Sequence, residues 1–388
     1  MGYDGMKFLH ISDLHLGRKI YNVSLLSDQE YLLGQILSII GKEKIDTIFI
    51  SGDIYDKHVP NTEAVICFDS FLTNLVEMNV EIFIIGGNHD SPERIQFGSR
   101  LLEKSKIHIS GIFQGVLNKS VLHDEYGAVN VYMLPFVKNT IAAFKMNHKS
   151  FSDTEEFIKT LFSKENIDER ERNILLYHGF VINGNRIEDL ERSDSELQVG
   201  GIDYVNANVF KSFDYVALGH IHAPQWVKKS SVRYSGSLMK YSFSEANQKK
   251  SVTIGEIKEK GNIEFKTISL DVKRDMRIIS GPFEEIKKYA EKTDDFIQIG
   301  LTDENIISYA VEQLREFYPN LLELIYLKKQ NNENISDLIE IQDVEKKDKF
   351  DLLKEFYESV YEYDLSEDNE LYKIMKNICE KAEEEGVL

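Results

Sequence analysis

Cysteine is nearly missing from this sequence, since only Cys67 and Cys379 occur among its 388 residues. The two lie far apart in unlike contexts, which excludes a framework of paired disulfides and fits a reducing cytosol. Apolar runs long enough to span a bilayer are also missing. The first seven residues lack the basic-then-apolar order of a signal peptide. We therefore predict a soluble, cytoplasmic protein that does not associate with a membrane.

An excess of positive charge is missing as well. The formal net charge is −19, whereas nucleic-acid binders are usually basic, so the composition argues mildly against that class. The acidity is uneven, because residues 331–388 hold 18 acidic and 7 basic side chains, which leaves a net charge of −8 for residues 1–330. Divalent cations bound by carboxylates would neutralise part of that remainder. The charge alone therefore does not exclude nucleic acid.

Internal repeats and long low-complexity tracts are absent, and 42% of the residues are hydrophobic, enough for a sizeable core. The length fits about two to three domains of roughly 100–200 residues each. Short apolar runs alternate with stretches of helical periodicity. The predicted strands span residues 7–12, 46–50, 82–85, 107–110, 129–134, 173–177 and 213–218, and the first predicted helices span 24–41 and 61–79. This alternation predicts a layered α/β domain over residues 1–270.

Three stretches of this first domain carry more local signals. Residues 114–127 predict a pair of strands with turns, and residues 140–168 predict a polar helical excursion over the surface. Ser91 and Pro92 predict the start of a helix, with the serine as its cap and the proline at its first position.

The sequence changes character near residue 271, where a small α+β domain is predicted over residues 271–330. Its predicted strands span 277–280, 296–301 and 321–327, and its predicted helices span 282–292 and 304–318. A charged linker follows over residues 331–349. Residues 350–388 predict two short amphipathic helices with the apolar side chains Leu352, Leu353, Phe356, Val360, Leu371, Ile374, Met375 and Ile378. Such a pair is too small to bury those faces alone, so it packs on its own body or on a partner.

Side chains of metal-ligand type follow five of the predicted strands. They are Asp13 and His15, Asp53, Asn88 and His89, His178, and His220 and His222. Each pattern is weak alone, because D-x-H is more often a polar loop and a single histidine is more often a core or surface residue. Five of the ten histidines lie in these positions, however. Since parallel strands end at one edge of a sheet, we expect these side chains to converge.

The expected ligand set mixes nitrogen and oxygen without thiolate, which suits manganese, iron or zinc. One ion does not need so many protein ligands, whereas two ions about 3.5–4 Å apart would use them with a shared carboxylate. Such a pair suits phosphoester hydrolysis, because it clamps phosphate oxygens and activates water. A histidine outside the ligand set would supply the proton that the leaving oxygen needs.

Taken in order, the motifs D-x-H, G-D, G-N-H-D, H-G and G-H-x-H resemble those of the calcineurin-like metallophosphoesterase family. Finer matches resemble the SbcD branch, the bacterial counterpart of the double-strand-break repair nuclease of archaea and eukaryotes. These matches span residues 12–18, 87–92, 199–205, 213–222, 234–238 and 242–245. The resemblance covers residues 6–270. It implies a four-layer α/β/β/α sandwich with a small α+β capping domain and a C-terminal helix pair.

The resemblance also implies a role for each ligand position. One ion would be held by Asp13, His15 and His222, the other by Asn88, His178 and His220, and Asp53 would bridge the two. Both ions would be divalent. The family prefers Mn²⁺, and Mg²⁺, Fe²⁺ and Zn²⁺ also fit.

Two further residues near the ligands receive catalytic roles by resemblance. His89 would be the histidine that helps the leaving group depart. Archaeal and eukaryotic relatives have a second histidine where this sequence has Asp56, and we expect Asp56 to orient His89.

The resemblance implies the nuclease subunit of an SbcCD-type complex in DNA repair, recombination and replication. Its activities would be 3′-to-5′ exonuclease action at duplex ends and endonuclease action on single strands and hairpins. Arg18, Lys273, Arg274 and Arg277 are candidate contacts to DNA phosphates. For the last three, a solvated charged turn is an equally good interpretation. The helix pair 350–388 would dock on the coiled coil of an SbcC-type ATPase, and helices 24–41 and 61–79 would form a homodimer.

Two other functions fit the same core. One is a phosphatase or cyclic-nucleotide phosphodiesterase, which we disfavour because neither activity requires the small domain and the helix pair. The other is a scaffold that has lost catalysis, which we disfavour because no ligand position is missing. Activity on DNA or on small phosphoesters separates the two enzymes, and metal binding separates the scaffold.

Overall fold

The computed structural model describes residues 5–184, 190–193 and 203–327, together with Tyr372 and Lys376. The chain divides into two units, Met1–Leu327 and Lys328–Leu388. In the second unit the described residues Tyr372 and Lys376 are helical. The predicted linker and the eight apolar side chains of the predicted helix pair lie outside the described residues. Both therefore stay predictions.

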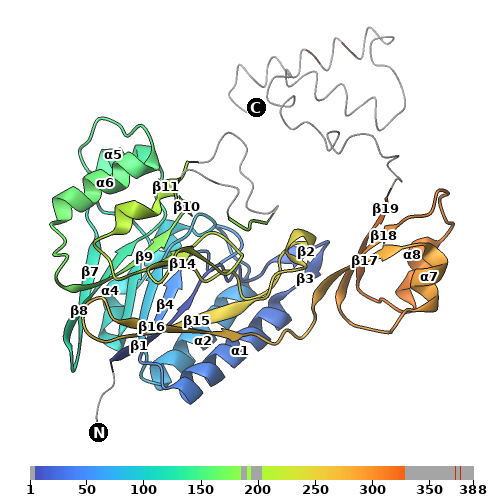
Figure 1. The fold of residues 1–388 in the computed structure, drawn as a ribbon, viewed down its shortest axis with the longest axis horizontal. Coiled ribbons are helices and arrows are strands. Elements are labelled where there is room, and N and C mark those ends of the chain that lie inside the picture. The colour runs from blue at the N-terminus through green and yellow to red at the C-terminus, as the bar shows by residue number, and fades with distance from the viewer. Residues whose placement is uncertain (1–4, 185–189, 194–202, 328–371, 373–375, 377–388) are drawn as a thin grey trace. The chain divides into compact units, whose positions relative to one another are not determined.

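The first unit contains two six-stranded sheets (Figure 1). In the first sheet, four parallel strands follow two antiparallel strands at one edge. Its order is β16 (Ile263–Ser269), β15 (Ser251–Ile257), β1 (Met6–Ile11), β4 (Thr47–Ser51), β5 (Glu81–Ile85) and β6 (Ile107–Ser110). The carboxyl ends of β1, β4 and β5 therefore lie at one edge of this sheet.

The second sheet has four parallel strands with an antiparallel strand at each edge. Its order is β13 (Gln225–Lys228), β14 (Val232–Tyr234), β12 (Tyr215–Gly219), β9 (Arg172–His178), β8 (Gly127–Leu134) and β7 (Asn118–Asp124). The first unit also contains short strand pairs and 3₁₀ turns. They are β2 (Lys19–Ile20), β3 (Val23–Ser24), β10 (Val181–Ile182), β11 (Val205–Asn206), η1 (Glu103–Ser105), η4 (Ala207–Phe210) and η5 (Phe243–Glu245).

The two sheets and the helices outside them form four layers, because side chains along each strand point alternately to the two faces of its sheet. In β1, Phe8 faces the second sheet, where it shares a core with Val131 and Ala217. The next residue, Leu9, faces the other way, toward α1 (Leu26–Glu43) and α2 (Thr62–Glu77). Successive side chains of a strand point to opposite faces, so one strand supplies both cores. The outer face of the second sheet packs on α5 (Asn139–Lys145) and α6 (Thr154–Glu165), which confirms the α/β/β/α sandwich.

The predictions for helix caps and for residues 114–127 are confirmed only in part. Asn61 caps α2 by accepting a hydrogen bond from the backbone N–H of Ala64, as its position indicated. The helix α3 (Pro92–Gln96) begins as predicted, with Ser91 at the N-cap position and Pro92 at its first position. The Ser91 hydroxyl makes no capping hydrogen bond, however, and donates to Glu93 instead. Residues 114–127 hold one strand, β7, and not two, because its partner is the following strand β8. A short α4 (Ser99–Leu102) follows α3.

The small sheet after residue 271 has its own core. Its parallel strands are β17 (Met276–Gly281), β18 (Phe296–Leu301) and β19 (Leu321–Tyr326), with α7 (Phe283–Lys288) and α8 (Ala310–Arg315) packed against them. This confirms the predicted strand–helix alternation. Met276 and Phe296 also pack into the core under the first sheet. Residues up to Leu327 form one compact unit, and the boundary at 270/271 stays a prediction.

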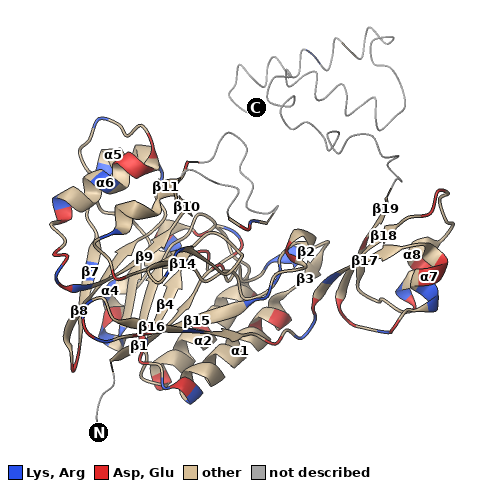
Figure 2. Ribbon diagram, viewed as in Figure 1, with Lys and Arg blue, Asp and Glu red and all other residues tan. Residues whose placement is uncertain are grey.

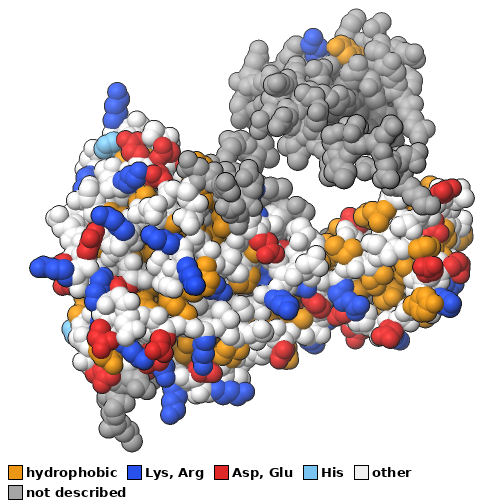
Figure 3. Space-filling view, in the orientation of Figure 1, with side chains coloured by type: hydrophobic (Ala, Val, Ile, Leu, Met, Phe, Trp, Pro, Cys, Tyr) orange, Lys and Arg blue, Asp and Glu red, His pale blue; other side chains and the backbone are white. Residues whose placement is uncertain are grey.

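The small domain leaves apolar side chains uncovered. Ile306 is 86% exposed and Tyr309 is 76% exposed. In Figure 3, orange side chains gather on the lobe that carries α7 and α8. Among the described residues, no helix has both the length and the apolar character needed to cross a bilayer.

Candidate metal centre

The loops that follow β1, β4, β5, β9 and β12 meet at one place, as the strand ends predicted. The backbone N–H of Asp13 donates to the carbonyl of Gly52, and that of His15 donates to the carbonyl of Asp53. The N–H of His220, after β12, donates to the Asp13 carboxylate at 2.9 Å. The first two bonds join the loops after β1 and β4 of the first sheet, and the third joins the carboxyl ends of the two sheets.

Several of these residues adopt unusual backbone conformations. The φ angles of Asp13, His15, Asp53 and His220 are 53°, 43°, 50° and 107°. Left-handed conformations cost non-glycine residues free energy, and they persist where the surrounding structure requires them. Glycine is required beside them at Gly87, where an added Cβ would lie 2.2 Å from the Asp53 carboxylate.

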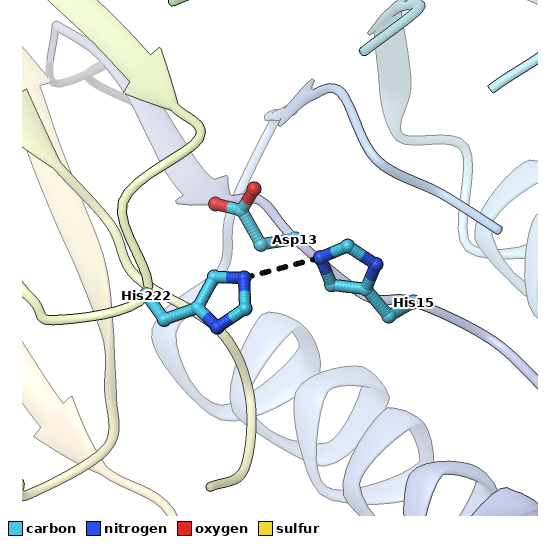
Figure 4. A group of neighbouring side chains, drawn as sticks. All are labelled: Asp13, His15 and His222. Atoms are coloured by element: carbon cyan, nitrogen blue, oxygen red, sulfur yellow. Dashed lines mark hydrogen bonds between the residues drawn. The ribbon is translucent and has the colours of Figure 1, made fainter. Parts of the chain in front are cut away.

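One group of ligands consists of Asp13, His15 and His222. Their ligand atoms lie within 4.8 Å of one another, and all three residues are buried. The Nε2 atoms of His15 and His222 face each other at 3.2 Å, as Figure 4 shows. The carboxylate of Asp13 lies beside them in the same view. The three side chains thus point into a common space.

A second group gathers around Asn88. Its side-chain oxygen lies 3.0 Å from His178 Nε2 and 3.0 Å from His220 Nδ1. One oxygen of Asp53 lies 3.5 Å from His178 Nε2 and 3.6 Å from His15 Nε2. Asp53 therefore touches both groups, at the position expected for a bridging ligand.

The donor set fits divalent cations. Ring nitrogens that face each other or face one shared oxygen need a proton or a cation between them. Burial, together with the nearby charge of His178, lowers the pKa of His220 to about 3. Burial also lowers the pKa of His15 well below its usual value. Both rings are therefore neutral, which is the form that binds metals. Nitrogen and oxygen donors without thiolate suit manganese, iron or zinc.

Asp53 and His178 form a buried pair of opposite charge. Burial opposes the charge on both, yet the attraction of the Asp53 carboxylate raises the pKa of His178 to about 9. The same attraction holds the pKa of Asp53 well below its usual range. A divalent cation would replace the proton on His178 as the positive charge beside Asp53.

His89 lies beside this centre and is only partly buried. Its ring meets that of His15 edge-on, with 4.8 Å between the ring centroids. Its backbone N–H donates to Asp53, and its Nδ1 lies 3.1 Å from the backbone carbonyl of Asp56. The carbonyl can only accept, so Nδ1 carries a proton and Nε2 is the free ring nitrogen.

Asp56 contacts His89 through its backbone and not through its carboxylate. The carboxylate instead pairs with Arg18 at 3.1 Å and lies 3.9 Å from Nδ1 of His15. Arg18 also lies over the ring of Tyr241, 5.1 Å from its centroid. Asp56 thus contacts the His89 ring as expected, and it does so through its main-chain carbonyl.

Asp90 holds two loops of the centre together, and no role was predicted for it in the sequence. Its buried carboxylate accepts the backbone N–H groups of Ile54, Tyr55 and Gly87 at 2.9–3.1 Å. It thereby ties the loop that carries Asp53 to the loop that carries Asn88 and His89. The sequence signal that could have indicated this role is the position of Asp90 at the end of the G-N-H-D motif.

A cavity of about 560 Å³ opens beside His89 and contains basic side chains. Arg18, Lys19 and Lys57 line it, and the last two are exposed. Lys19 and Lys57 were missed in the sequence, where neither stands in a motif. Elsewhere Figure 2 shows Lys and Arg interspersed with Asp and Glu. Lys138 and Arg192 line a second cavity together with His178 and His220, so basic side chains near the centre line two cavities.

The three basic residues predicted near the small domain differ in environment. Arg274 makes two hydrogen bonds to buried Asp28 of α1 and lies 4.4 Å from the centroid of the Phe296 ring. These contacts give Arg274 a structural role, and its predicted contact to DNA stays a prediction. Arg277 is half exposed and pairs with Asp295 at 3.2 Å. Lys273 is exposed.

Comparison with known proteins agrees with this geometry. The family model of calcineurin-like phosphoesterases matches residues 6–224. The chain is 33% identical to the SbcD subunit of the nuclease SbcCD from Staphylococcus saprophyticus, over 97% of this chain and 100% of that protein. The chain belongs to the SbcD family of calcineurin-like phosphoesterases. A second member, from Staphylococcus epidermidis, is 30% identical over 93% of this chain and 95% of that protein.

Two further matches were found for this SbcD-family chain. A model described as the type 5 capsule protein repressor C-terminal domain matches residues 272–361, which include the small sheet. Among solved structures, a dimetal phosphatase from Danio rerio aligns with 69% of this chain and 100% of its own, at 14% identity and a TM-score of 0.40.

Proposed function

We propose that this protein is the metal-dependent DNA nuclease subunit of an SbcCD-type complex. The observation that carries the proposal is the meeting of two ligand groups at Asp53. It occurs in a chain aligned over nearly its whole length with proteins named as nuclease subunits. A nuclease activity requires a centre that acts on phosphodiesters, and the convergent N and O ligands supply its parts.

The proposed centre holds two divalent ions. Asp13, His15 and His222 would hold one, Asn88, His178 and His220 the other, and Asp53 would be shared. Bound ions would supply Lewis acidity and a nucleophile at neutral pH. Manganese is the metal that the family resemblance favours.

His89 is proposed to protonate the leaving oxygen. Its protonated ring can donate from Nε2, while the carbonyl of Asp56 keeps the proton on Nδ1. After transfer the ring is the neutral tautomer that this hydrogen bond already favours. Ring orientation by a backbone carbonyl fixes the donor without adding a negative charge beside it.

The basic cavity beside His89 is proposed to receive the DNA backbone. Arg18, Lys19 and Lys57 would contact phosphates, with Lys273 and Arg277 as further contacts. Such contacts release counterions, so binding would weaken as salt rises. The preferred substrates would be duplex ends, single strands and hairpins.

The partners are part of the proposal. An SbcC-type ATPase would bind the segment 350–388, and a homodimer would form through α1 and α2. Exposed apolar side chains on these helices, among them Tyr31, Val65 and Ile66, support the dimer, because they are 47%, 42% and 59% exposed. We also retain a cytoplasmic location and domains at 1–270, 271–330, 331–349 and 350–388.

Cleavage of a labelled DNA hairpin with Mn²⁺, beside an aryl phosphodiester, tests the proposal. We expect cleavage of the DNA, and we expect a chelator to abolish it. Cleavage of the aryl ester alone would contradict a nuclease and would favour the phosphodiesterase alternative. Cleavage of neither substrate by a protein that binds no manganese would favour the scaffold.

A further inference from the structure

A buried pair of opposite charge lies next to His222 and has no role in the function proposed above. Glu245 is fully buried and Lys250 is 5% exposed. The Lys250 ammonium donates to the Glu245 carboxylate at 2.7 Å. Isolated buried charges are costly, so the pair must stay together.

Lys250 determines the ionisation state of the Glu245 carboxylate. Besides Glu245, the ammonium contacts the carbonyl of His222 at 2.8 Å, the Ser237 hydroxyl at 2.9 Å and the Gln248 side-chain oxygen at 2.7 Å. An ammonium can only donate hydrogen bonds. The carboxylate beside it is therefore held ionised and acts only as an acceptor.

The other oxygen of Glu245 contacts the His222 ring. It lies 3.1 Å from Nδ1. Because this oxygen only accepts, Nδ1 must carry the ring proton. Nε2 then keeps its lone pair and points to His15 and Asp13, the direction shown in Figure 4. The structure thus presents the metal-binding nitrogen of His222 in the required tautomer.

We propose that Glu245 is a positioning residue that, with Lys250, fixes the tautomer and orientation of His222 toward the ion held by Asp13 and His15. The proposal rests on the metal centre of the proposed function. Carboxylates that accept from the second nitrogen of a metal-binding histidine fix its ring and raise its basicity. Glu245 would therefore favour one of the two ion positions, because no ligand of the other contacts it in the described part of the chain.

The substitution Glu245→Gln tests the positioning role, because it exchanges donor and acceptor in the hydrogen bond between residue 245 and Nδ1 of His222. Lys250 needs an acceptor, so the amide oxygen of Gln would face Lys250. The amide NH₂ would then face Nδ1 of His222, which would have to accept. The ring proton would move to Nε2, the atom that faces the ion.

The experiment measures manganese bound to the full-length protein by titration and electron paramagnetic resonance. We expect two ions in wild-type protein with a coupled-pair spectrum. In Glu245→Gln we expect one ion at wild-type affinity, a second weakened by about tenfold to hundredfold, and an uncoupled spectrum. Glu256→Gln is the matched control, since Glu256 pairs with Lys7 on a sheet strand away from the centre. It should bind like wild type.

A second measurement determines the tautomer of His222 in the wild-type protein itself. In metal-free wild-type protein with nitrogen-15-labelled histidine, we expect the His222 ring to carry its proton on Nδ1. The His222→Asn protein identifies the signals. A proton on Nε2 would overturn the proposal, as would two ions of wild-type affinity in folded Glu245→Gln.

The measurements distinguish a failure of the positioning role from a failure of the nuclease proposal. If the protein cleaves no DNA but Glu245→Gln still loses one ion, the positioning role stands and the substrate is wrong. If wild type and Glu245→Gln both cleave DNA and bind two ions alike, the nuclease stands and the positioning role fails.

Discussion

At the scale of single residues, the burial of one histidine makes the stability of the fold depend on pH. His10 is buried between the sheets, where its ring contacts the Tyr215 hydroxyl at 2.9 Å and the Leu218 carbonyl at 3.1 Å. Burial, with the nearby positive charge of Arg233, lowers its pKa from 6.5 to about 3. The folded protein therefore keeps this ring neutral in a pH range where the unfolded chain protonates it.

This predicts acid sensitivity from one histidine. Because the unfolded state binds the extra proton below pH 6.5, the free energy of unfolding falls as the pH falls from 6.5 toward 3. Between roughly pH 6 and 4, the free energy of unfolding of His10→Gln should fall less steeply than that of wild type, by about 1.4 kcal/mol per pH unit. Urea unfolding of both proteins at several pH values measures it. Equal slopes would contradict the prediction, and the exposed His123→Gln is the control.

His89 should separate catalysis from metal binding. His89→Ala is expected to lower DNA cleavage by about 10²–10⁴-fold, because the leaving oxygen loses its proton donor. The manganese content should stay at the wild-type value. His89 also lies within 4.8 Å of ligand atoms of His15 and Asp53. If the variant lost metal together with activity, His89 would be a ligand and not the proton donor.

At the scale of elements, one ion pair joins α1 to the start of the small domain. Arg274 is 19% exposed at its side chain and its partner Asp28 is 2% exposed. Arg274→Met should lower the free energy of unfolding by about 3 kcal/mol, because Asp28 stays buried without its partner. DNA cleavage under folding conditions should change little.

Arg277→Met is the matched control for this pair. Arg277 is 52% exposed and its ion pair with Asp295 is solvated, so the loss should be no more than about 1 kcal/mol. Thermal or urea unfolding of both variants gives the comparison. Similar stability changes in the two would mean that Arg274 does not hold α1 to the small domain.

The helices and strands also show which features of the structure could be predicted from the sequence. Strand ends and their polar residues were predictable, because parallel strands bring their carboxyl ends together whatever the details of packing. The Arg274–Asp28 pair was not, since its partners are 246 residues apart and meet only in the folded chain. For the same reason the sequence could place Asp56 beside His89 but could not say which Asp56 atom makes the contact, which is the carbonyl oxygen.

At the scale of the whole molecule, the C-terminal segment should be separable from the centre. Deleting residues 350–388 should leave manganese-dependent DNA cleavage near the wild-type level, because every proposed ligand lies before residue 223. Association with the SbcC-type ATPase should be lost. Co-purification with the ATPase and hairpin cleavage measure the two effects. A truncated protein that still binds the ATPase would place the docking surface elsewhere.

The central claim is a two-ion centre that shares Asp53 and cleaves DNA. Its most direct measurement is manganese stoichiometry together with hairpin cleavage in wild type and Asp53→Asn. The amide keeps the shape of the side chain but removes the charge that contacts both ligand groups. We predict two ions and cleavage in wild type, with both lost together in the variant. Full cleavage by an Asp53→Asn protein that binds fewer than two ions would contradict the claim.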